Sequence, residues 1–85
     1  MKYETNITEI DTSEEALPEY QQRVLIEKKE LDARIEKLEA FFKDAYFKVL
    51  PGTSQELMRD QLRTMREYSQ ILHSRIATFK EADNG

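Results

Sequence analysis

Residues 54–81 read SQELMRDQLRTMREYSQILHSRIATFKE, and the apolar positions in this stretch recur at alternating spacings of four and three residues. The recurring positions, interrupted by one serine, are Met58, Leu62, Met65, Ser69, Leu72, Ile76 and Phe79. Side chains with this spacing lie along one side of an α-helix, and a sustained seven-residue repeat is typical of two helices packed along their length. The stretch therefore predicts a helix over 54–81 whose packing partner is another helix.

The first half of the chain carries a matching repeat. Leu17, Val24, Leu31 and Leu38 stand seven residues apart, and Pro18 suits the first position of a helix because its φ angle is already helical. The surrounding charges mix both signs, which is typical of a solvated helix face. The pattern predicts a second helix over 17–44.

The segment between the helices, residues 45–53, is predicted to be a turn. Pro51 and Gly52 are a strong turn signal, and Phe47 is expected to fold back over the end of the helices. Thr53 and Glu56 have the spacing of a capping box, in which each side chain bonds a backbone N–H of the first helical turn.

Folding the chain at this turn brings the two apolar rows together in antiparallel order. In that alignment Leu31 meets Met65, Val24 meets Leu72, and the polar Lys28 meets the polar Ser69. The fold class is all-α, an antiparallel two-helix hairpin with a heptad seam. Lys28 has two interpretations: its stem packs while its ammonium reaches the edge, or it fixes the register or the oligomeric state.

Apolar residues beside the seam widen each apolar stripe beyond what two helices cover. They are Tyr20, Leu25, Phe41, Leu57 and Ile71. A chain of 85 residues forms a small core, so burial of these side chains in a homo-oligomer would add stability. We expect hairpins to assemble into a helical-bundle oligomer. The alternative is a monomer in which the N-terminal arm covers this surface.

The net charge of −4 is unevenly distributed. Residues 1–19 hold six acids and one lysine, a balance of −5, and residues 20–85 hold twelve bases and eleven acids, a balance of +1. The sequence predicts an acidic N-terminal arm over 1–16 and a polar tail over 82–85. The nearly neutral body permits binding of a small anion but lacks the basic footprint of a protein that binds duplex nucleic acid.

The composition favours binding over catalysis. The chain has no cysteine, one histidine and glycine only at positions 52 and 85, so we expect no metal site, no phosphate-binding glycine loop and no cofactor. Serines within helices lack the exposed turn that nucleophiles usually occupy. The apolar runs are too short for a membrane span or a signal peptide. We expect no enzyme activity and no contact with membranes.

A row of arginines on the second helix is the candidate ligand site. Arg59, Arg63 and Arg66 stand at i, i+4 and i+7, and His73 continues their row. The planar guanidinium group suits bidentate contact with phosphate, and Tyr68 could stack on a base in an oligomer. The sequence therefore suggests a site for an anionic nucleotide. The alternative is a solvated flank whose arginines pair with nearby acids.

Several strings give the chain a family resemblance. They are LPEYQQRV at 17–24, EKKELD at 27–32 and IEKL at 35–38, continued in the second helix to about residue 77. With these strings the chain resembles the uncharacterised family of small tailed-bacteriophage proteins named after a crAss-like phage protein. The resemblance implies a phage accessory protein in the cytoplasm of an infected bacterium. It implies no catalytic residue.

These observations lead to one main hypothesis about function. The protein is expected to act in counter-defence without catalysis, by binding and sequestering a host immune component such as a signalling nucleotide. By analogy, small oligomeric helical phage proteins can act in this way. The alternatives are an inhibitor or adaptor that grips a host defence protein through its helical surface or acidic arm, and a structural bundle protein.

Overall fold

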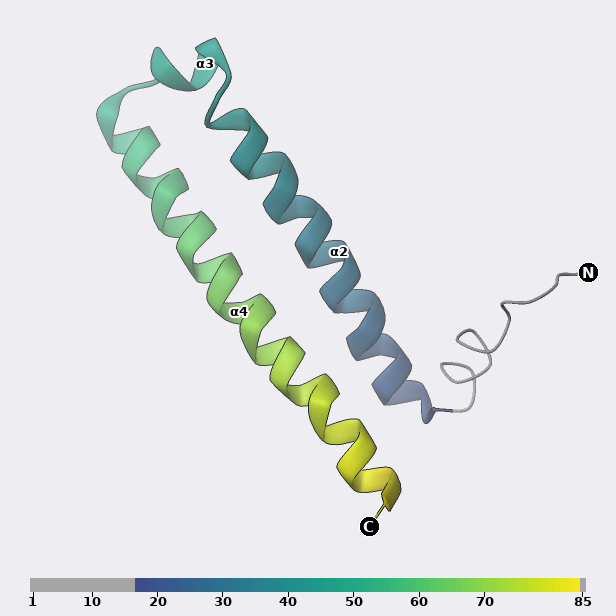
Figure 1. Ribbon diagram of the computed structural model, residues 1–85. Helices are drawn as coiled ribbons and strands as arrows, with labels where there is room; N and C mark the ends of the chain where they lie inside the picture. The colour runs from purple at the N-terminus through teal and green to yellow at the C-terminus, as the bar shows by residue number, and fades with distance from the viewer. Residues whose placement is uncertain (1–16, 85) are drawn as a thin grey trace, which may run out of the picture.

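The described part of the chain is a pair of long helices lying side by side. The structure, a computed structural model, describes residues 17–84, and the side chains of residues 17–79. Its elements are α2 (Glu19–Phe41), α3 (Ala45–Lys48) and α4 (Gly52–Asn84). In Figure 1, α2 and α4 run in opposite directions and α3 joins them at one end. The prediction of an all-helical, antiparallel hairpin is confirmed for the described residues, while the predicted arm over 1–16 lies outside them.

Helix α2 is shorter at both ends than the predicted 17–44. Pro18 is extended, with φ −55° and ψ 153°, so it precedes the helix and is not its first residue. Its carbonyl accepts the first helical bond, from the N–H of Gln22 at 3.1 Å. At the other end Asp44 is extended and its side chain accepts a hydrogen bond from the N–H of Tyr46 at 2.8 Å. Aspartate stabilises a helix start better than a helix interior, so α2 ends at Phe41 and α3 begins after Asp44.

The predicted turn over 45–53 contains the short helix α3, which closes the end of the hairpin. Phe47 is only 4% exposed, and its ring centroid lies 4.6 Å from that of Phe42 and 5.9 Å from that of Phe41. The expectation that Phe47 folds back over the helix ends is therefore confirmed. The Gln55 side chain, on α4, donates to the carbonyl of Leu50 at 3.0 Å and fixes the loop to the start of α4.

Helix α4 is longer than the predicted 54–81. It begins at Gly52, where the Pro51 carbonyl accepts from the N–H of Gln55 at 3.0 Å. Thr53 therefore lies inside the helix and is not its N-cap, so the predicted capping box is wrong. The helix continues to Asn84 because the sequence offers no glycine or proline after Gly52 until position 85. Residues 82–84 are thus helical and not the start of an irregular tail.

The core lies between α2 and α4. Its buried cluster is Val24, Leu31, Leu72 and Phe79, with Leu72 completely buried, and all four belong to the rows predicted to face inward. Gln21, in the row between Leu17 and Val24, is buried as well, and its side chain donates to the Tyr20 hydroxyl at 3.2 Å. The buried rows account for the stability of the hairpin, because apolar area removed from water contributes about 25 cal/mol per Å².

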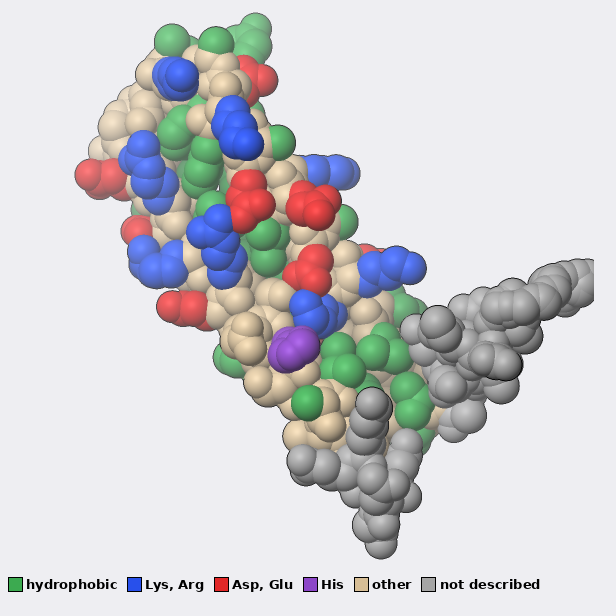
Figure 2. Space-filling view, in the orientation of Figure 1, with side chains coloured by type: hydrophobic (Ala, Val, Ile, Leu, Met, Phe, Trp, Pro, Cys, Tyr) green, Lys and Arg blue, Asp and Glu red, His purple; other side chains and the backbone are tan. Residues whose placement is uncertain are grey.

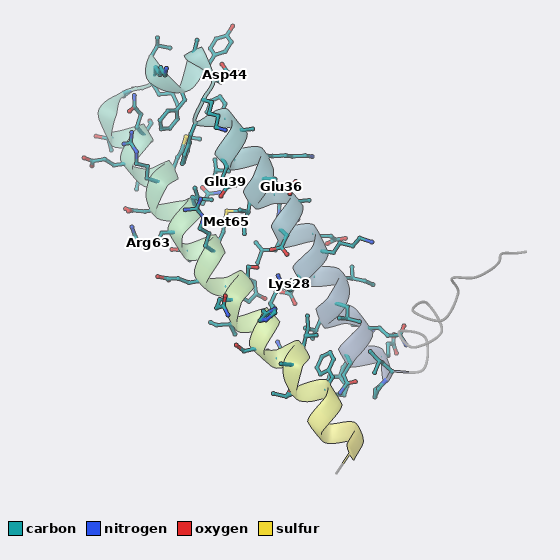
Figure 3. The ribbon with its side chains drawn as sticks, viewed as in Figure 1. Lys28, Glu36, Glu39, Asp44, Arg63 and Met65 are labelled. Atoms are coloured by element: carbon teal, nitrogen blue, oxygen red, sulfur yellow. The ribbon has the colours of Figure 1, made fainter. Side chains whose placement is uncertain are left out.

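A polar layer interrupts this core midway along the hairpin. The Lys28 ammonium donates to the Ser69 hydroxyl at 3.1 Å, which confirms the predicted pairing of these two residues, and to the Asp32 carboxylate at 2.7 Å. Ser69 in turn donates to the other Asp32 oxygen at 2.6 Å. Figure 3 shows the Lys28 side chain in the space between the helices. The sequence reasoning missed Asp32, although its i,i+4 spacing from Lys28 was a signal for an ion pair.

The hydrogen bond from Lys28, followed by that from Ser69, lowers the pKa of Asp32 from its ordinary value of 3.8. A lowered pKa in the folded state means that the ionised carboxylate stabilises the fold above pH 3.8 and that this contribution is lost as the pH falls through the lowered value. The polar layer is therefore acid-sensitive.

Replacing Leu72 with alanine should destabilise the hairpin strongly. Removing a completely buried leucine side chain typically costs about 3 kcal/mol through lost transfer energy and a residual cavity. Urea unfolding followed by circular dichroism measures the change. The matched control is Ile26→Ala, because Ile26 is 55% exposed and its removal should change the free energy of unfolding by less than about 0.5 kcal/mol. Equal effects of the two substitutions would contradict this description of the core.

Asp32→Asn should flatten the acid dependence of stability. Below pH 3.8 the free energy of unfolding of the unmodified protein should fall with pH more steeply than that of the variant, because only the former loses an ionised Asp32. Urea unfolding at a series of acidic pH values gives both slopes. Asp60→Asn serves as control, since Asp60 pairs with Arg63 on the exposed surface and that variant should retain the slope. Parallel slopes for all three proteins would rule out the role of the polar layer.

Candidate functional site

The hairpin has two broad faces, one on each side of the core. Two hydrogen-bonded pairs between the helices mark them: Arg66 with Glu39, and Tyr68 with Glu27. Two residues along an α-helix correspond to a rotation of about 200°, so Arg66 and Tyr68 project from nearly opposite sides of α4. We call one side the arginine face: Arg59, Arg63, Arg66, Gln70 and His73 of α4, with Glu39 of α2. The other is the tyrosine face: Tyr20 and Glu27 of α2, with Leu57, Tyr68, Ile71 and Arg75 of α4.

The arginine face combines guanidinium groups with a smaller number of acids. Arg63 pairs with Asp60 on its own helix at 2.9 Å, and Arg66 pairs with Glu39 across the hairpin. Figure 2 shows this side, with blue side chains along α4 beside red ones toward α2 and with the purple imidazole of His73, the chain's single histidine. The pairs are exposed: 63% of the Arg63 side chain and 57% of the Arg66 side chain face solvent. Their charges are thus available to a ligand from outside.

Arg59 differs from the other arginines of this face. Its guanidinium carbon lies 5.3 Å from the centroid of the buried Phe47 ring. Within residues 17–79, no acidic side chain forms an ion pair with it. The aromatic ring positions the guanidinium group but does not neutralise its charge. Arg59 is therefore the member of the row whose positive charge is least compensated.

The tyrosine face exposes several large apolar side chains. Leu57 is 63% exposed and Ile71 is 57% exposed. The Tyr68 hydroxyl donates to the Glu27 carboxylate, and this hydrogen bond raises the pKa of Tyr68 above 10.0. An open hollow on the outer side of α4, at the edge of this face, is lined mainly by apolar surface of Gln70, Ile71, Ser74, Arg75 and Thr78. This side of the hairpin resembles a contact surface more than a ligand pocket.

The structure divides the predicted nucleotide-site residues between the two faces. Arg59, Arg63, Arg66 and His73 share the arginine face, whereas Tyr68 lies on the tyrosine face. Within one chain Tyr68 is thus not placed to stack on a base held by the arginines. The sequence already indicated this separation, because residues two positions apart on an α-helix, such as Arg66 and Tyr68, point in nearly opposite directions.

The residues predicted to form a partner surface also differ in their surroundings. Tyr20, Leu57 and Ile71 are exposed on the tyrosine face, with Tyr20 60% exposed. Leu25 is partly buried and packs against the core cluster, and Phe41 packs edge-on against Phe47. Leu25 and Phe41 therefore contribute mainly to packing within the hairpin, Leu25 against the core cluster and Phe41 against Phe47 of α3.

The described residues hold no group of three metal-ligating side chains. Neither long helix, over its described residues, has a stretch apolar enough to cross a membrane.

Comparison with known proteins assigns the chain to a family. The family model of Sequestin matches residues 18–78, which comprise α2, α3 and most of α4. An uncharacterised 7.5 kDa protein from the denB–rIIB intergenic region of Enterobacteria phage T4 is 38% identical over 61 residues, which are 72% of this chain and 95% of the relative. No solved structure matches the chain. The resemblance to small phage proteins is thus confirmed, under the name Sequestin and without reference to a crAss-like phage. The chain belongs to the Sequestin family of small phage proteins.

Proposed function

We propose that this chain is a non-enzymatic phage accessory protein that sequesters an anionic signalling nucleotide of the host's immune system in the infected bacterial cytoplasm. The observation that carries the proposal is the row of exposed guanidinium groups on the arginine face, with Arg59 unpaired to any acid among the described residues. The name of the family suggests sequestration, and the T4 relative is a phage protein. Both agree with counter-defence.

Phosphate is the ligand group that this row of side chains suits best. Arg59, Arg63 and Arg66 stand at i, i+4 and i+7, so their guanidinium groups follow one side of α4 over about two turns. Each group offers a planar pair of N–H donors that matches two oxygens of a phosphate. A nucleotide with two or more phosphates could span successive arginines.

The acids on this face do not prevent anion binding. The pairs Arg63–Asp60 and Arg66–Glu39 are both exposed, and exposed ion pairs typically contribute between about 0 and 1 kcal/mol. An arriving phosphate can replace such a carboxylate at little cost, whereas Arg59 requires no displacement. The acids instead provide selectivity, because they disfavour anions that cannot form bidentate contacts.

Binding should be measurable by isothermal titration calorimetry against a panel of cyclic and linear nucleotides. The unmodified protein should release heat with at least one of them, and the double variant Arg59→Ala/Arg63→Ala should bind it at least tenfold more weakly. The affinity should fall as salt rises, because the contacts are ionic.

The matched control for this titration is Arg23→Ala. Arg23 is 75% exposed and pairs with Glu19 on α2, so it reproduces the loss of an exposed arginine away from the arginine face. The control should keep the affinity of the unmodified protein. Absence of heat with every nucleotide would refute sequestration of a nucleotide, and equal losses in both variants would refute the assignment to the arginine face.

The tyrosine face favours a second candidate function, that of an inhibitor or adaptor that binds a protein of the host's defence. Its exposed apolar side chains, Leu57 and Ile71, are of the kind that protein interfaces bury. Affinity capture from infected cells would identify such a partner. Loss of the captured protein with Ile71→Asp, but not with Arg59→Ala, would distinguish this function from nucleotide binding.

A further inference from the structure

The arginine face carries positive charge that the described acids compensate only in part. Arg63 pairs with Asp60, and Arg66 pairs with Glu39. Arg59, within residues 17–79, has no acidic partner. All three arginines are exposed, and in Figure 2 blue side chains follow α4 along this side of the hairpin. A negatively charged segment is therefore attracted to the α4 side of the face.

The chain itself contains a complementary anionic segment, the arm of residues 1–16. This arm holds five acids and one lysine, and Glu4 and Glu9 are the two acids farthest from the hairpin in sequence. The family match begins at residue 18, so the arm lies outside the hairpin that the family shares. A carboxylate, like a phosphate, accepts two parallel N–H bonds from one guanidinium group. The arm therefore offers the arginines the same kind of contact as a nucleotide does.

The base of the arm is at the start of α2, at the end of the hairpin opposite α3 (Figure 1). The hydrogen bond between Lys28 and Ser69 shows which residues of α2 and α4 are level, and it places residue 17 level with roughly residue 80. At 1.5 Å per residue along α4, Arg66 is then about 21 Å and Arg59 about 32 Å from the base of the arm. The acids of the arm must bridge these distances to contact the arginines.

The arm is long enough for two of its acids to reach the arginine row. An extended chain covers about 3.3 Å per residue, so Glu9 extends to about 26 Å and Glu4 to about 43 Å from the base of the arm. Glu9 therefore reaches the level of Arg66, and Glu4 reaches the level of Arg59. Glu15 extends to only about 7 Å and falls short of both arginines. The length of the arm thus separates acids that can contact the row from acids that cannot.

The covalent connection makes a weak contact sufficient. A group on the same chain meets its site at an effective concentration in roughly the millimolar range, so a contact with a dissociation constant near that value is populated. Arg59 has no acid to be displaced, and the exposed pairs of Arg63 and Arg66 exchange partners easily because such pairs are weak.

From these observations we infer that the acidic arm, residues 1–16, docks on the arginine row of its own chain, with Glu4 and Glu9 contacting the guanidinium groups. The arm then occupies the anion site until a ligand with more negative charge displaces it, and weakly charged anions are excluded. The docking follows from charge and reach alone, whereas the competition with a nucleotide rests on the proposed function.

Paramagnetic relaxation enhancement in the full chain tests the docking. The chain has no cysteine, so a nitroxide label can be attached at Thr8→Cys alone. At low salt the side-chain N–H signals of Arg63 and Arg66 should broaden more than the methyl signals of Ile71 on the tyrosine face, although Ile71 is nearer to the base of the arm. High salt should remove this difference, because exposed ionic contacts are screened.

The same labelled protein, diluted with an excess of unlabelled protein, should keep the broadening because the contact lies within one chain. Loss of the broadening on dilution would overturn docking on the same chain. Equal or stronger broadening of Ile71 would overturn docking on the arginine face.

Two charge-matched variants test the competition, with inorganic pyrophosphate as the probe. Glu4→Gln/Glu9→Gln removes the two acids that reach the row, and calorimetry should show pyrophosphate binding about threefold tighter than in the unmodified protein. Glu15→Gln/Glu19→Gln removes the same charge from positions that do not reach the row, and it should leave the affinity unchanged. Equal gains in both variants would overturn the competition, because the arm would then act only through its net charge.

Failure of the proposed function gives a different result from failure of this inference. If neither pyrophosphate nor any nucleotide releases heat with any variant, the anion site is refuted, and the broadening at Arg63 and Arg66 still decides whether the arm docks. If an anion binds but the label at position 8 broadens neither arginine, the docking of the arm alone is refuted.

Discussion

Burial of one apolar row on each of two antiparallel helices is the constraint on which the rest of this structure depends. An isolated helix gains little stability in water, so α2 and α4 persist because Val24 and Leu31 pack with Leu72 and Phe79. The contact between two helices covers only one side of each. On the described residues, this contact leaves one open face on each side of the core.

The polar layer of Lys28, Asp32 and Ser69 adds specificity to this packing. Apolar rows with equal periods can pair in several registers, each shifted by a heptad, with similar burial. Lys28 can pair with Asp32 of its own helix in any register, but only the observed register brings Ser69 of α4 to this pair, where it accepts from Lys28 and donates to Asp32. A shifted register would place an apolar side chain opposite the half-buried pair and remove both hydrogen bonds with Ser69, which costs free energy. This layer, together with the packing of Phe47 at the end of the hairpin where α3 lies, fixes the register of the two helices. The register in turn decides which residues are exposed on each face.

Much of the fold could be predicted from spacing, and the errors occur where capping decides. The rows that bury Val24, Leu31, Leu72 and Phe79 are visible in the sequence because the side-chain position repeats every seven residues. The predicted C-terminal end of α2 was wrong because the Asp44 side chain accepts a hydrogen bond from the N–H of Tyr46 and starts α3, and the predicted N-terminal end was wrong because Pro18 is extended. The partners of the candidate site residues, such as Glu39 for Arg66, could not be predicted because long charged side chains have several acids within reach.

The sequence by itself determined that the described chain is a helical hairpin and that Lys28 lies opposite Ser69, since periodicity fixes which side of a helix is buried. It also determined that the side chains of Arg66 and Tyr68 point to opposite sides of α4, because each residue of an α-helix is rotated by about 100° from the one before it. Only the tertiary structure decided what that separation means. The rotation of each helix about its axis, set by packing of the whole core, places Glu39 beside the arginines and Glu27 beside Tyr68. That packing separates the arginine face from the tyrosine face.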